Sequence, residues 1–341
     1  MRWGVVLNIR VGERGRPAGA ACWRVHAGSL ETIDIRSGGA YTVGRSSAGT
    51  VLPHTWSLAG GREVRCDERP LVMGIVNVTP DSFYDGGRYG TRERAVAHAL
   101  DLVGEGADLL DIGGESTRPG AQPVGEEEEL TRVLPVLAEL ARRVTIPISV
   151  DTTKAGVARR ALDAGAAIIN DVSALRRDPD MAAVIAEKGA GVVLMHMSGT
   201  PQSMQEAPHY DDVVAEVRLF LDERMQAAEE AGIAKTNIVL DPGIGFGKLM
   251  VHNLQLLHHL SDLMMLNRPL LVGVSRKNFI GHLVDRPVGQ RQWGTAAAVA
   301  LAVAGGAQIL RVHDVAAMAD VVKVASAVRS CPSATKQENY A

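Results

Sequence analysis

The feature that most constrains the fold is an alternation of strand-like and helix-like runs from about residue 69 to residue 330. Apolar runs such as PLVMGIVNV (70–78) are followed by segments with helical spacing, such as TRERAVAHALDLVGEGA (91–107). Strands that alternate with helices form a parallel sheet. About eight such units in about 260 residues fit a (β/α)8 barrel. We therefore predict an α/β fold, a TIM barrel, with an open doubly wound sheet as the alternative.

The N-terminal segment, residues 1–66, has a different pattern. Short apolar pieces are separated there by glycine-rich turns, and the segment holds Trp3, Trp23 and Trp56, three of the four tryptophans. This pattern predicts short strands or hairpins. We predict three parts: an N-terminal extension of unknown role (1–66), the barrel (67–331) and a flexible C-terminal tail (332–341).

Composition and charge exclude several classes of partner. The net charge is −3 and there is no long basic tract, so neither nucleic acid nor a membrane surface is expected as a partner. No apolar run is long enough to cross a bilayer, and the N-terminus is a poor secretory signal. The three cysteines are far apart and odd in number, which fits neither a zinc site nor a disulfide framework. These features predict a cytoplasmic protein with reduced thiols.

Polar side chains follow every predicted strand, at the end where barrels of this kind place their active sites. The predicted strand ends are Asn77, Asp111, Asp151, Asn170 with Asp171, Met195 with His196, Asp241, Ser275 to Asn278, and Arg311 to Asp314. Buried polar groups are costly unless they are paired, so a purely structural barrel would not collect them. The pattern therefore predicts a functional rim.

The predicted rim divides into two chemical groups. Carboxylates and amides suit a heterocycle that presents N–H donors and nitrogen acceptors along one edge. This group comprises Asp111, Asp151, Asp171, Asp241, Asn77 and Asn170. A cationic group suits two anionic partners, one of phosphate type and one carboxylate. It comprises Arg118, Lys277, Arg311 and His313.

Single residues of this pattern also have simpler interpretations. A strand-end Asp often caps a helix, and a buried histidine such as His196 is more often packed than metal-bound. The loop PGIGFGK (242–248) lacks the end of a phosphate-binding P-loop, because Leu249 follows Lys248. Four glutamates at 126–129 are typical of the solvated start of a helix. The prediction of a site therefore depends on the joint pattern.

Eight motifs, in order, identify a family. They are MGIVNVTPDSFYDGG, DIGGESTRPGA, SVDT, INDVSAL, LMHMSGTP, DPGIGFGK, GVSRK and RVHDV. Together they closely resemble dihydropteroate synthase, the folate-pathway enzyme that sulfonamides inhibit, over about residues 68–330.

Three alternatives fit the sequence less well than this resemblance. GGESTRPG and SRK argue against a methyltetrahydrofolate–corrinoid methyltransferase, which shares the pterin-binding barrel. The presence of Arg118, Lys277, Arg311 and His313 argues against a noncatalytic pterin-binding paralogue. A phosphosugar aldolase-type barrel explains the fold but not the pocket of acids and amides.

The resemblance implies a transferase. Members of the family join 6-hydroxymethyl-7,8-dihydropterin pyrophosphate to p-aminobenzoate, giving 7,8-dihydropteroate and pyrophosphate. They use Mg²⁺, are commonly homodimers, and are inhibited by sulfonamides. A dissociative, SN1-like loss of pyrophosphate, followed by attack of the arylamine, is the expected course. Two loops, TPDSFYDGG and DIGGESTRPG, are expected to close over the pterin and complete the second substrate site.

The resemblance also assigns roles to residues. The pterin would contact Asp151, Asn170, Met195, Asp241 and Lys277. The p-aminobenzoate site would comprise Phe83, Thr117, Arg118, Pro119, Ser275 and Asn278. Pyrophosphate would contact Arg118, Arg311 and His313, and Mg²⁺ would lie near Asn77 and Asp85. The residues expected to carry the catalysis are Asp151, Asp241, Lys277, Arg311 and His313.

Three positions depart from the family's commonest spelling: Tyr84, Leu249 and Asn278. Asn278 would lie beside the p-aminobenzoate carboxylate. Because an amide still donates a hydrogen bond, we expect activity to be retained while the affinity for p-aminobenzoate or for sulfonamides is altered.

Overall fold

The computed structural model of the protein describes residues 54–66, 69–79, 91–116, 120–200 and 202–331. Ten strands lie in these ranges. Two form a hairpin, β1 (Thr55–Leu58) and β2 (Arg62–Arg65). The others are β3 (Leu71–Asn77), β4 (Leu109–Gly113), β5 (Ile148–Asp151), β6 (Ile168–Asp171), β7 (Gly191–Met195), β8 (Ile238–Asp241), β9 (Leu271–Val272) and β10 (Ile309–Val312).

The eight strands from β3 to β10 form one parallel sheet. The hydrogen-bonded order is β8-β7-β6-β5-β4-β3-β10-β9. The two outer strands of that order meet, because Leu240 and Leu270 form a parallel bridge and the Leu240 N–H donates to the Pro269 carbonyl at 3.0 Å. The sheet is thus nearly closed into a barrel. The predicted TIM-like barrel is confirmed, and the open doubly wound sheet is excluded.

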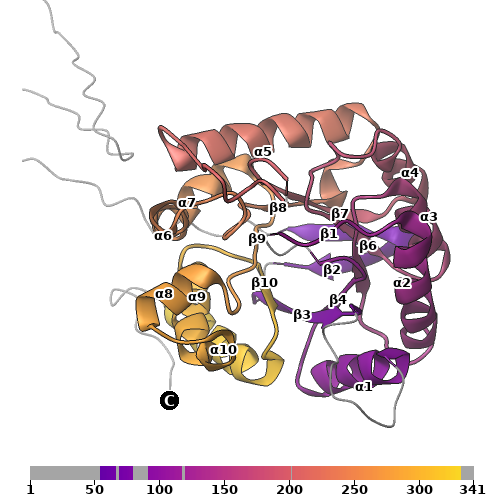
Figure 1. Cartoon of the computed structure of the whole chain (residues 1–341), viewed down its shortest axis with the longest axis horizontal. Coiled ribbons are helices and arrows are strands. Elements are labelled where there is room, and N and C mark those ends of the chain that lie inside the picture. The colour runs from indigo at the N-terminus through magenta and orange to yellow at the C-terminus, as the bar shows by residue number, and fades with distance from the viewer. Residues whose placement is uncertain (1–53, 67–68, 80–90, 117–119, 201, 332–341) are drawn as a thin grey trace, which may run out of the picture. The chain divides into compact units, whose positions relative to one another are not determined.

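Helices surround the strands (Figure 1). The longer ones are α1 (Thr91–Gly104), α2 (Glu126–Leu140), α3 (Ala155–Asp163), α4 (Met181–Lys188), α5 (Val213–Glu230), α6 (Met250–His258), α9 (Gln292–Ala304) and α10 (Val315–Ser330). A short helix α7 (Leu260–Leu263) follows α6, and a second short helix, α8 (Asn278–Val284), is additional to the predicted pattern. Short 3-10 turns cover Ala59–Gly61, Lys235–Asn237, Met264–Leu266 and Val288–Gln290. Within the described residues, no helix combines the length and apolar character needed to span a bilayer.

Local sequence signals fix several helix ends. The side chain of Asp212 accepts hydrogen bonds from the backbone N–H groups of Val214 and Ala215, so it caps the first turn of α5. Four glutamates occupy the first turn of α2, where negative charge stabilises the helix dipole. Helix α4 ends at Lys188 and is followed by Gly189, whose φ of 58° is left-handed and favours glycine.

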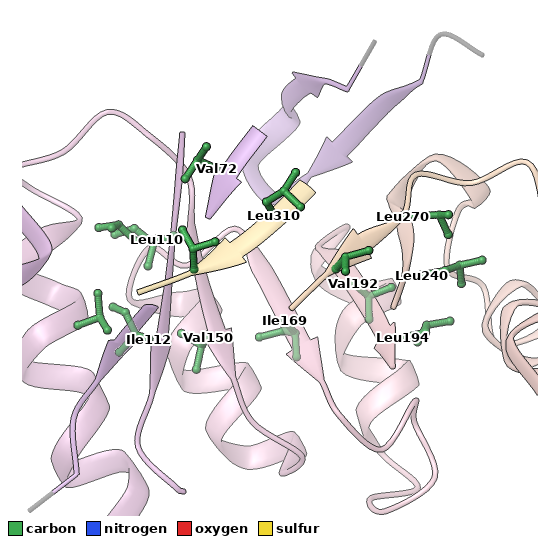
Figure 2. Close-up of a cluster of buried hydrophobic side chains, with 14 of the residues drawn as sticks. Val72, Leu110, Ile112, Val150, Ile169, Val192, Leu194, Leu240, Leu270 and Leu310 are labelled. Atoms are coloured by element: carbon green, nitrogen blue, oxygen red, sulfur yellow. The ribbon is translucent and has the colours of Figure 1, made fainter. Parts of the chain in front are cut away.

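Outward-facing side chains of the strands pack beneath the helices. Along β4, Leu110 and Ile112 point outward, and so do Val150 of β5 and Ile169 of β6. Figure 2 shows these residues with Val72, Val192, Leu194, Leu240, Leu270 and Leu310. All of them are almost fully buried. This layer is the main hydrophobic core, and it leaves the alternate residues of each strand to fill the barrel.

Inward-facing side chains near the starts of the strands form an apolar floor. They are Leu71, Met73, Leu109, Ile168, Val193, Val239, Leu271 and Ile309, and the hairpin contributes Trp56, Leu58 and Cys66. Trp56 is fully buried, and its indole N–H donates to the Asn237 carbonyl at 2.8 Å. A Cβ on Gly191 would lie 2.6 Å from Leu58 Cδ2, so the glycine makes room for the hairpin. The hairpin therefore closes the lower end of the barrel.

This hairpin falls within the segment predicted as an N-terminal extension, residues 1–66. The predicted strand-like pieces before residue 54, and the tail at 332–341, lie outside the described residues. The division of the chain into an extension, a barrel and a tail therefore stays a prediction.

Candidate active site

The inside of the barrel is lined by apolar side chains near the starts of the strands and by polar side chains near their ends. Successive side chains of a strand point to opposite faces, so a residue two positions beyond a floor residue also points inward. Four strands follow this rule: Leu109 and Asp111, Ile168 and Asn170, Val239 and Asp241, and Ile309 and Arg311. In β5, Asp151 lies two positions beyond the buried Ser149. The rim predicted from the strand ends is thus assembled by strand geometry.

Arg311 joins the acids of one side of the rim. Its Nε donates to Asp111 Oδ2 at 2.6 Å, and its Nη2 donates to Asp151 Oδ2 at 3.0 Å. Asn170 Nδ2 also donates to Asp111 Oδ2, at 3.1 Å. The other carboxylate oxygen, Asp111 Oδ1, is buried and has no hydrogen-bond partner among the described residues. The network therefore leaves one acceptor for a ligand or a water.

The charge on Asp151 is finely balanced. Burial raises the pKa of Asp151 to about 7; Arg311 opposes this rise and the Asp111 carboxylate reinforces it. A carboxyl with this pKa can exchange a proton near neutral pH. A charged ligand bound nearby would therefore change the protonation of Asp151.

The opposite side of the rim combines an acceptor, a cation and an aromatic ring. Asp241 Oδ1 accepts from the Gly243 N–H at 2.7 Å, and burial raises the pKa of this carboxyl to about 6. Lys277 Nζ lies 4.0 Å from the centroid of the Phe246 ring. Although part of its surface is accessible, its pKa is lowered to about 8 by desolvation and by Arg311.

Met195 adds an apolar surface to this side of the rim. It pairs in register with Asp241 and is buried in a cluster with Val172, Met197 and Met204, against which Phe246 packs. A polarisable thioether beside an aromatic ring suits a flat, electron-rich ligand. Met195 therefore lies beside Asp241, and Phe246 lies between the cluster of Met195 and the ammonium of Lys277.

Ser275 and His313 form a pair at the rim. The Ser275 hydroxyl accepts from the His313 backbone N–H at 3.2 Å and lies 2.9 Å from His313 Nδ1. Donation from the hydroxyl to Nδ1 leaves the proton on Nε2. The prediction that His313 is a cation was wrong: burial, with help from Arg276 and Arg311, lowers its pKa to about 3. His313 is a neutral N–H donor.

Asp171 is wrongly placed in the predicted acid group. Its carboxylate accepts from the Ser173 N–H at 2.7 Å and the Leu175 N–H at 2.9 Å, so it holds the turn after β6. Asp171 follows inward-facing Asn170, and the strand period turns it away from the barrel interior. The sequence could not separate these neighbours, because the side that each faces depends on the strand's orientation.

The prediction that the four glutamates at 126–129 form the solvated start of a helix was wrong for Glu129. That side chain is buried, and Lys154 Nζ lies 2.5 Å from its Oε2 while also contacting the Glu115 carboxylate. The spacing of Glu129, Val133 and Leu140 follows one face of the helix, a signal that could have predicted its burial.

Other predicted site residues lie at the rim or outside the described ranges. Asn77 ends β3 and is half-buried, and its Oδ1 would lie 4.0 Å from a Cβ on Gly113. Asn278 is exposed, and its Oδ1 accepts from Arg291 Nη1 at 3.1 Å. The residues outside are Phe83, Tyr84, Asp85, Thr117, Arg118 and Pro119. Across the described ranges, no three His, Cys, Asp or Glu side chains gather as a metal site.

Comparison with known proteins identifies this arrangement. Residues 73–313 match the family model described as "Pterin binding enzyme". The dihydropteroate synthase of Synechocystis is 48% identical over 262 residues, which cover 76% of this chain and 91% of that protein.

Solved structures agree with the sequence comparison. Xanthomonas albilineans dihydropteroate synthase with 4-aminobenzoic acid has a TM-score of 0.76 and 54% identity, covering 82% of this chain and 100% of that one. The same enzyme was also solved with 7,8-dihydropteroate, at a TM-score of 0.73, 52% identity and coverage of 80% and 98%. Yersinia pestis dihydropteroate synthase, in a sulfonamide complex, has a TM-score of 0.76 and 47% identity, with coverage of 80% and 98%.

Proposed function

The chain belongs to the dihydropteroate synthase family of pterin-binding enzymes, and on this premise we propose how its barrel rim divides the work of the reaction. The chain is a transferase. It condenses 6-hydroxymethyl-7,8-dihydropterin pyrophosphate with p-aminobenzoate and releases pyrophosphate and 7,8-dihydropteroate. The roles of individual residues, the metal, the oligomer and the location are proposals.

The observation that best supports these roles is the convergence of Asp241, Lys277 and Asn170 on the upper end of one barrel. Asp241 is an acceptor-only carboxylate when ionised, and it would take the N–H groups of the pterin's guanidine-like edge. Lys277 would donate to an acceptor on the ring, and Met195 with Phe246 would contact its faces. Asp151 and Asn170 would bind the remaining polar positions.

The bond that breaks joins the pterin methylene carbon to a pyrophosphate oxygen, and its electron pair leaves with that oxygen. Arg311 and the Nε2–H of His313, with Arg118, would stabilise the charge that grows there. The ring nitrogens would stabilise the methylene cation, and the buried carboxylates Asp111 and Asp151 would favour it electrostatically. The arylamine nitrogen then bonds to the methylene carbon and loses a proton. No strong base is required, because an arylamine is neutral at pH 7.

The p-aminobenzoate site would be formed by Ser275, Asn278 and the loop residues Phe83, Thr117, Arg118 and Pro119. Ser275 would act chiefly by fixing the tautomer of His313, since its hydroxyl is already engaged there. The amide N–H of Asn278 would meet the substrate carboxylate while its oxygen stays on Arg291. Sulfonamides would compete for the same place.

Asn77 fits a Mg²⁺ ion chemically, because its amide oxygen is a hard ligand at the end of β3. Magnesium sites commonly use only one or two protein oxygens when substrate phosphates supply others. Asn77 and Asp85 would hold the ion, which when bound would neutralise charge on the pyrophosphate.

A homodimer is supported by exposed apolar side chains on two adjacent helices. Leu301 of α9 and Val324 and Val328 of α10 are 63%, 66% and 73% exposed. Monomeric proteins rarely expose such groups together, and a second copy would cover them. A cytoplasmic location is supported by the sequence, whose three cysteines are far apart and odd in number and so fit no disulfide framework.

The test of the function is product formation by the purified chain. Given both substrates and Mg²⁺, the chain should form 7,8-dihydropteroate and pyrophosphate in equal amounts. Omission of p-aminobenzoate should abolish dihydropteroate formation. Binding of the pterin substrate without product would instead identify a noncatalytic relative.

A further inference from the structure

Lys248 is a buried lysine whose hydrogen-bond partners among the described residues are all uncharged. It ends the loop that follows β8 and is 3% exposed. Its Nζ lies 2.8 Å from His196 Nδ1, 3.0 Å from the carbonyl oxygens of Gly243 and Phe246, and 3.4 Å from that of His196. Lysine is almost never fully buried unless it is paired. A buried cation held by carbonyls therefore calls for a functional reason.

The shell around Lys248 suits an ammonium ion. An ammonium has three N–H donors, and carbonyl oxygens can only accept. Burial lowers the pKa of His196 to about 2, so its ring is neutral and Nδ1 can accept as well. Burial also lowers the pKa of Lys248 to about 7, while Asp241 opposes this change. Lys277 adds to the lowering of this pKa, whereas the four hydrogen-bond partners of Lys248 Nζ are all acceptors and favour its protonated form.

Lys248 links two loops that approach each other closely. Gly243 has a φ of 66°, and a Cβ there would lie 1.8 Å from the His196 carbonyl oxygen. Gly247 has a φ of 61°, and its Cβ would lie 2.5 Å from the Ser198 carbonyl oxygen. The two glycines allow the loop after β8 to lie directly on the loop after β7, and Lys248 binds both.

The backbone groups that Lys248 holds belong to residues that shape the candidate pterin site. The Gly243 carbonyl accepts from Lys248, and the Gly243 N–H donates to Asp241 Oδ1. The Phe246 carbonyl also accepts from Lys248, and the Phe246 ring lies against Lys277. One ammonium thus holds the Gly243 residue that orients the acceptor and the Phe246 residue that contacts the cation.

We propose that Lys248 is a positioning residue for the pterin site, whose buried ammonium fixes the loop 242–248 so that Asp241, Phe246 and Lys277 face the substrate. The proposal rests on the proposed function for the identity of the ligand. Lys248 itself is covered and does not touch the substrate. Its loss should therefore weaken pterin binding without removing any group that contacts the pterin.

The first experiment compares Lys248→Met with the wild-type chain. We expect the dissociation constant for dihydropterin pyrophosphate, followed by pterin fluorescence, to rise about tenfold or more. The KM for p-aminobenzoate at saturating pterin should change less than about twofold, since Lys248 acts on the first site only. Lys188→Met, on α4, is the matched control for loss of a lysine charge and should bind the pterin normally. Normal pterin binding by folded Lys248→Met would overturn the proposal.

Chemical rescue separates positioning by charge from packing alone. Lys248→Ala lacks the atoms of a propylammonium ion, so added n-propylammonium chloride should restore pterin affinity, whereas n-propanol at the same concentration should not. Lys248→Gln keeps two N–H donors and should lose less affinity than Lys248→Met. Equal rescue by propanol, or equal loss in the Gln and Met variants, would contradict a role for the ammonium. Failure of all three variants to fold would also overturn the proposal, because it would make Lys248 a residue of fold stability.

The pterin dissociation constants, unlike the KM for p-aminobenzoate, do not depend on the transferase activity. A wild-type chain that binds the pterin but forms no product would refute the proposed function and leave the Lys248 comparison intact. A chain that makes product with unchanged pterin affinity in Lys248→Met would refute only the positioning role.

Discussion

The floor and the rim of this barrel are lined by residues two positions apart on the same strands, yet they differ in chemistry. Leu109, Ile168 and Val239 point into the floor, where Trp56 of the hairpin covers them. Two positions further along, Asp111, Asn170 and Asp241 point into the rim. The floor gains stability by removing apolar surface from water. The rim buries polar groups that oppose folding unless they are paired, so its composition is explained by the reaction.

The difference has a pH signature. Burial raises the pKa of Asp241 from 3.8 to about 6. The folded state therefore holds this proton more tightly than the unfolded state, and the contribution of Asp241 to stability declines as the pH rises from 3.8 through about 6. Asp151, with a pKa raised to about 7, acts in the same direction over a wider range. At neutral pH the buried carboxyl groups of the rim therefore lower the free energy of unfolding, whereas the apolar floor raises it.

The largest expected effect is at the floor. Trp56→Ala would leave a cavity beneath the barrel and remove the hydrogen bond to the Asn237 carbonyl. We expect the free energy of unfolding to fall by about 3–5 kcal/mol. Chemical denaturation measures this loss, and kcat/KM of the folded enzyme should stay near the wild-type value. A large loss of kcat/KM with unchanged stability would reverse the roles assigned to floor and rim.

Lys154, which precedes α3, should affect the free energy of unfolding more than substrate binding. It contacts two carboxylates, those of Glu115 and buried Glu129, whereas the shell of Lys248 is made of uncharged acceptors. Lys154→Met would leave both acids uncompensated and should lower the free energy of unfolding by about 3 kcal/mol. Thermal or urea unfolding would detect it. Glu129→Gln should cost less, because Lys154 keeps Glu115; a larger cost in Glu129→Gln would refute this ranking.

Among the rim variants, Asp241→Asn should reduce pterin affinity strongly while it changes the free energy of unfolding little. The variant loses a negative charge and puts an N–H donor where the pterin edge requires an acceptor. We expect pterin affinity to fall at least about 100-fold, or about 2.7 kcal/mol, with little loss in the free energy of unfolding. Calorimetric titration and urea denaturation measure the two quantities. Near-normal turnover in this variant would refute the account of the pterin site.

The smallest effect is expected at Asn278, on the exposed edge of the rim. Asn278→Ser removes the acceptor for Arg291 but keeps a hydrogen-bond donor near the proposed p-aminobenzoate carboxylate. We expect the KM for p-aminobenzoate to change about two- to fivefold and pterin affinity to stay unchanged. Steady-state kinetics with each substrate varied in turn would measure both. A change in pterin affinity instead would place Asn278 in the other site.

Much of the architecture could be predicted from the sequence. Strand–helix alternation predicted the barrel, and the ordered motifs predicted the family, both of which are confirmed. Strand ends located Asp111, Asp151 and Asp241, because parallel strands deliver their carboxyl ends to one rim. The short hairpin that closes the floor was not located, since its contacts with residues such as Asn237 join segments far apart in the chain.

The errors have a common physical cause. The sequence does not show which of two neighbouring residues points inward, so it could not separate Asp171 from Asn170. The charge of His313 depends on burial and on nearby guanidinium groups, which only the fold brings together. The role of Lys248 could not be predicted, because its hydrogen-bond partners lie on two different loops.

The most direct test of the central claim, that an ionised and buried Asp241 holds the pterin, is the pH dependence of pterin binding. The dissociation constant for dihydropterin pyrophosphate would be measured from pH 5 to pH 8 in the wild type and in Asp241→Asn. Affinity in the wild type should fall as the pH drops through about 6, because the protonated carboxyl no longer accepts two hydrogen bonds. This inflection should be absent in the variant. A wild-type profile without it, or the same inflection in both proteins, would contradict the claim.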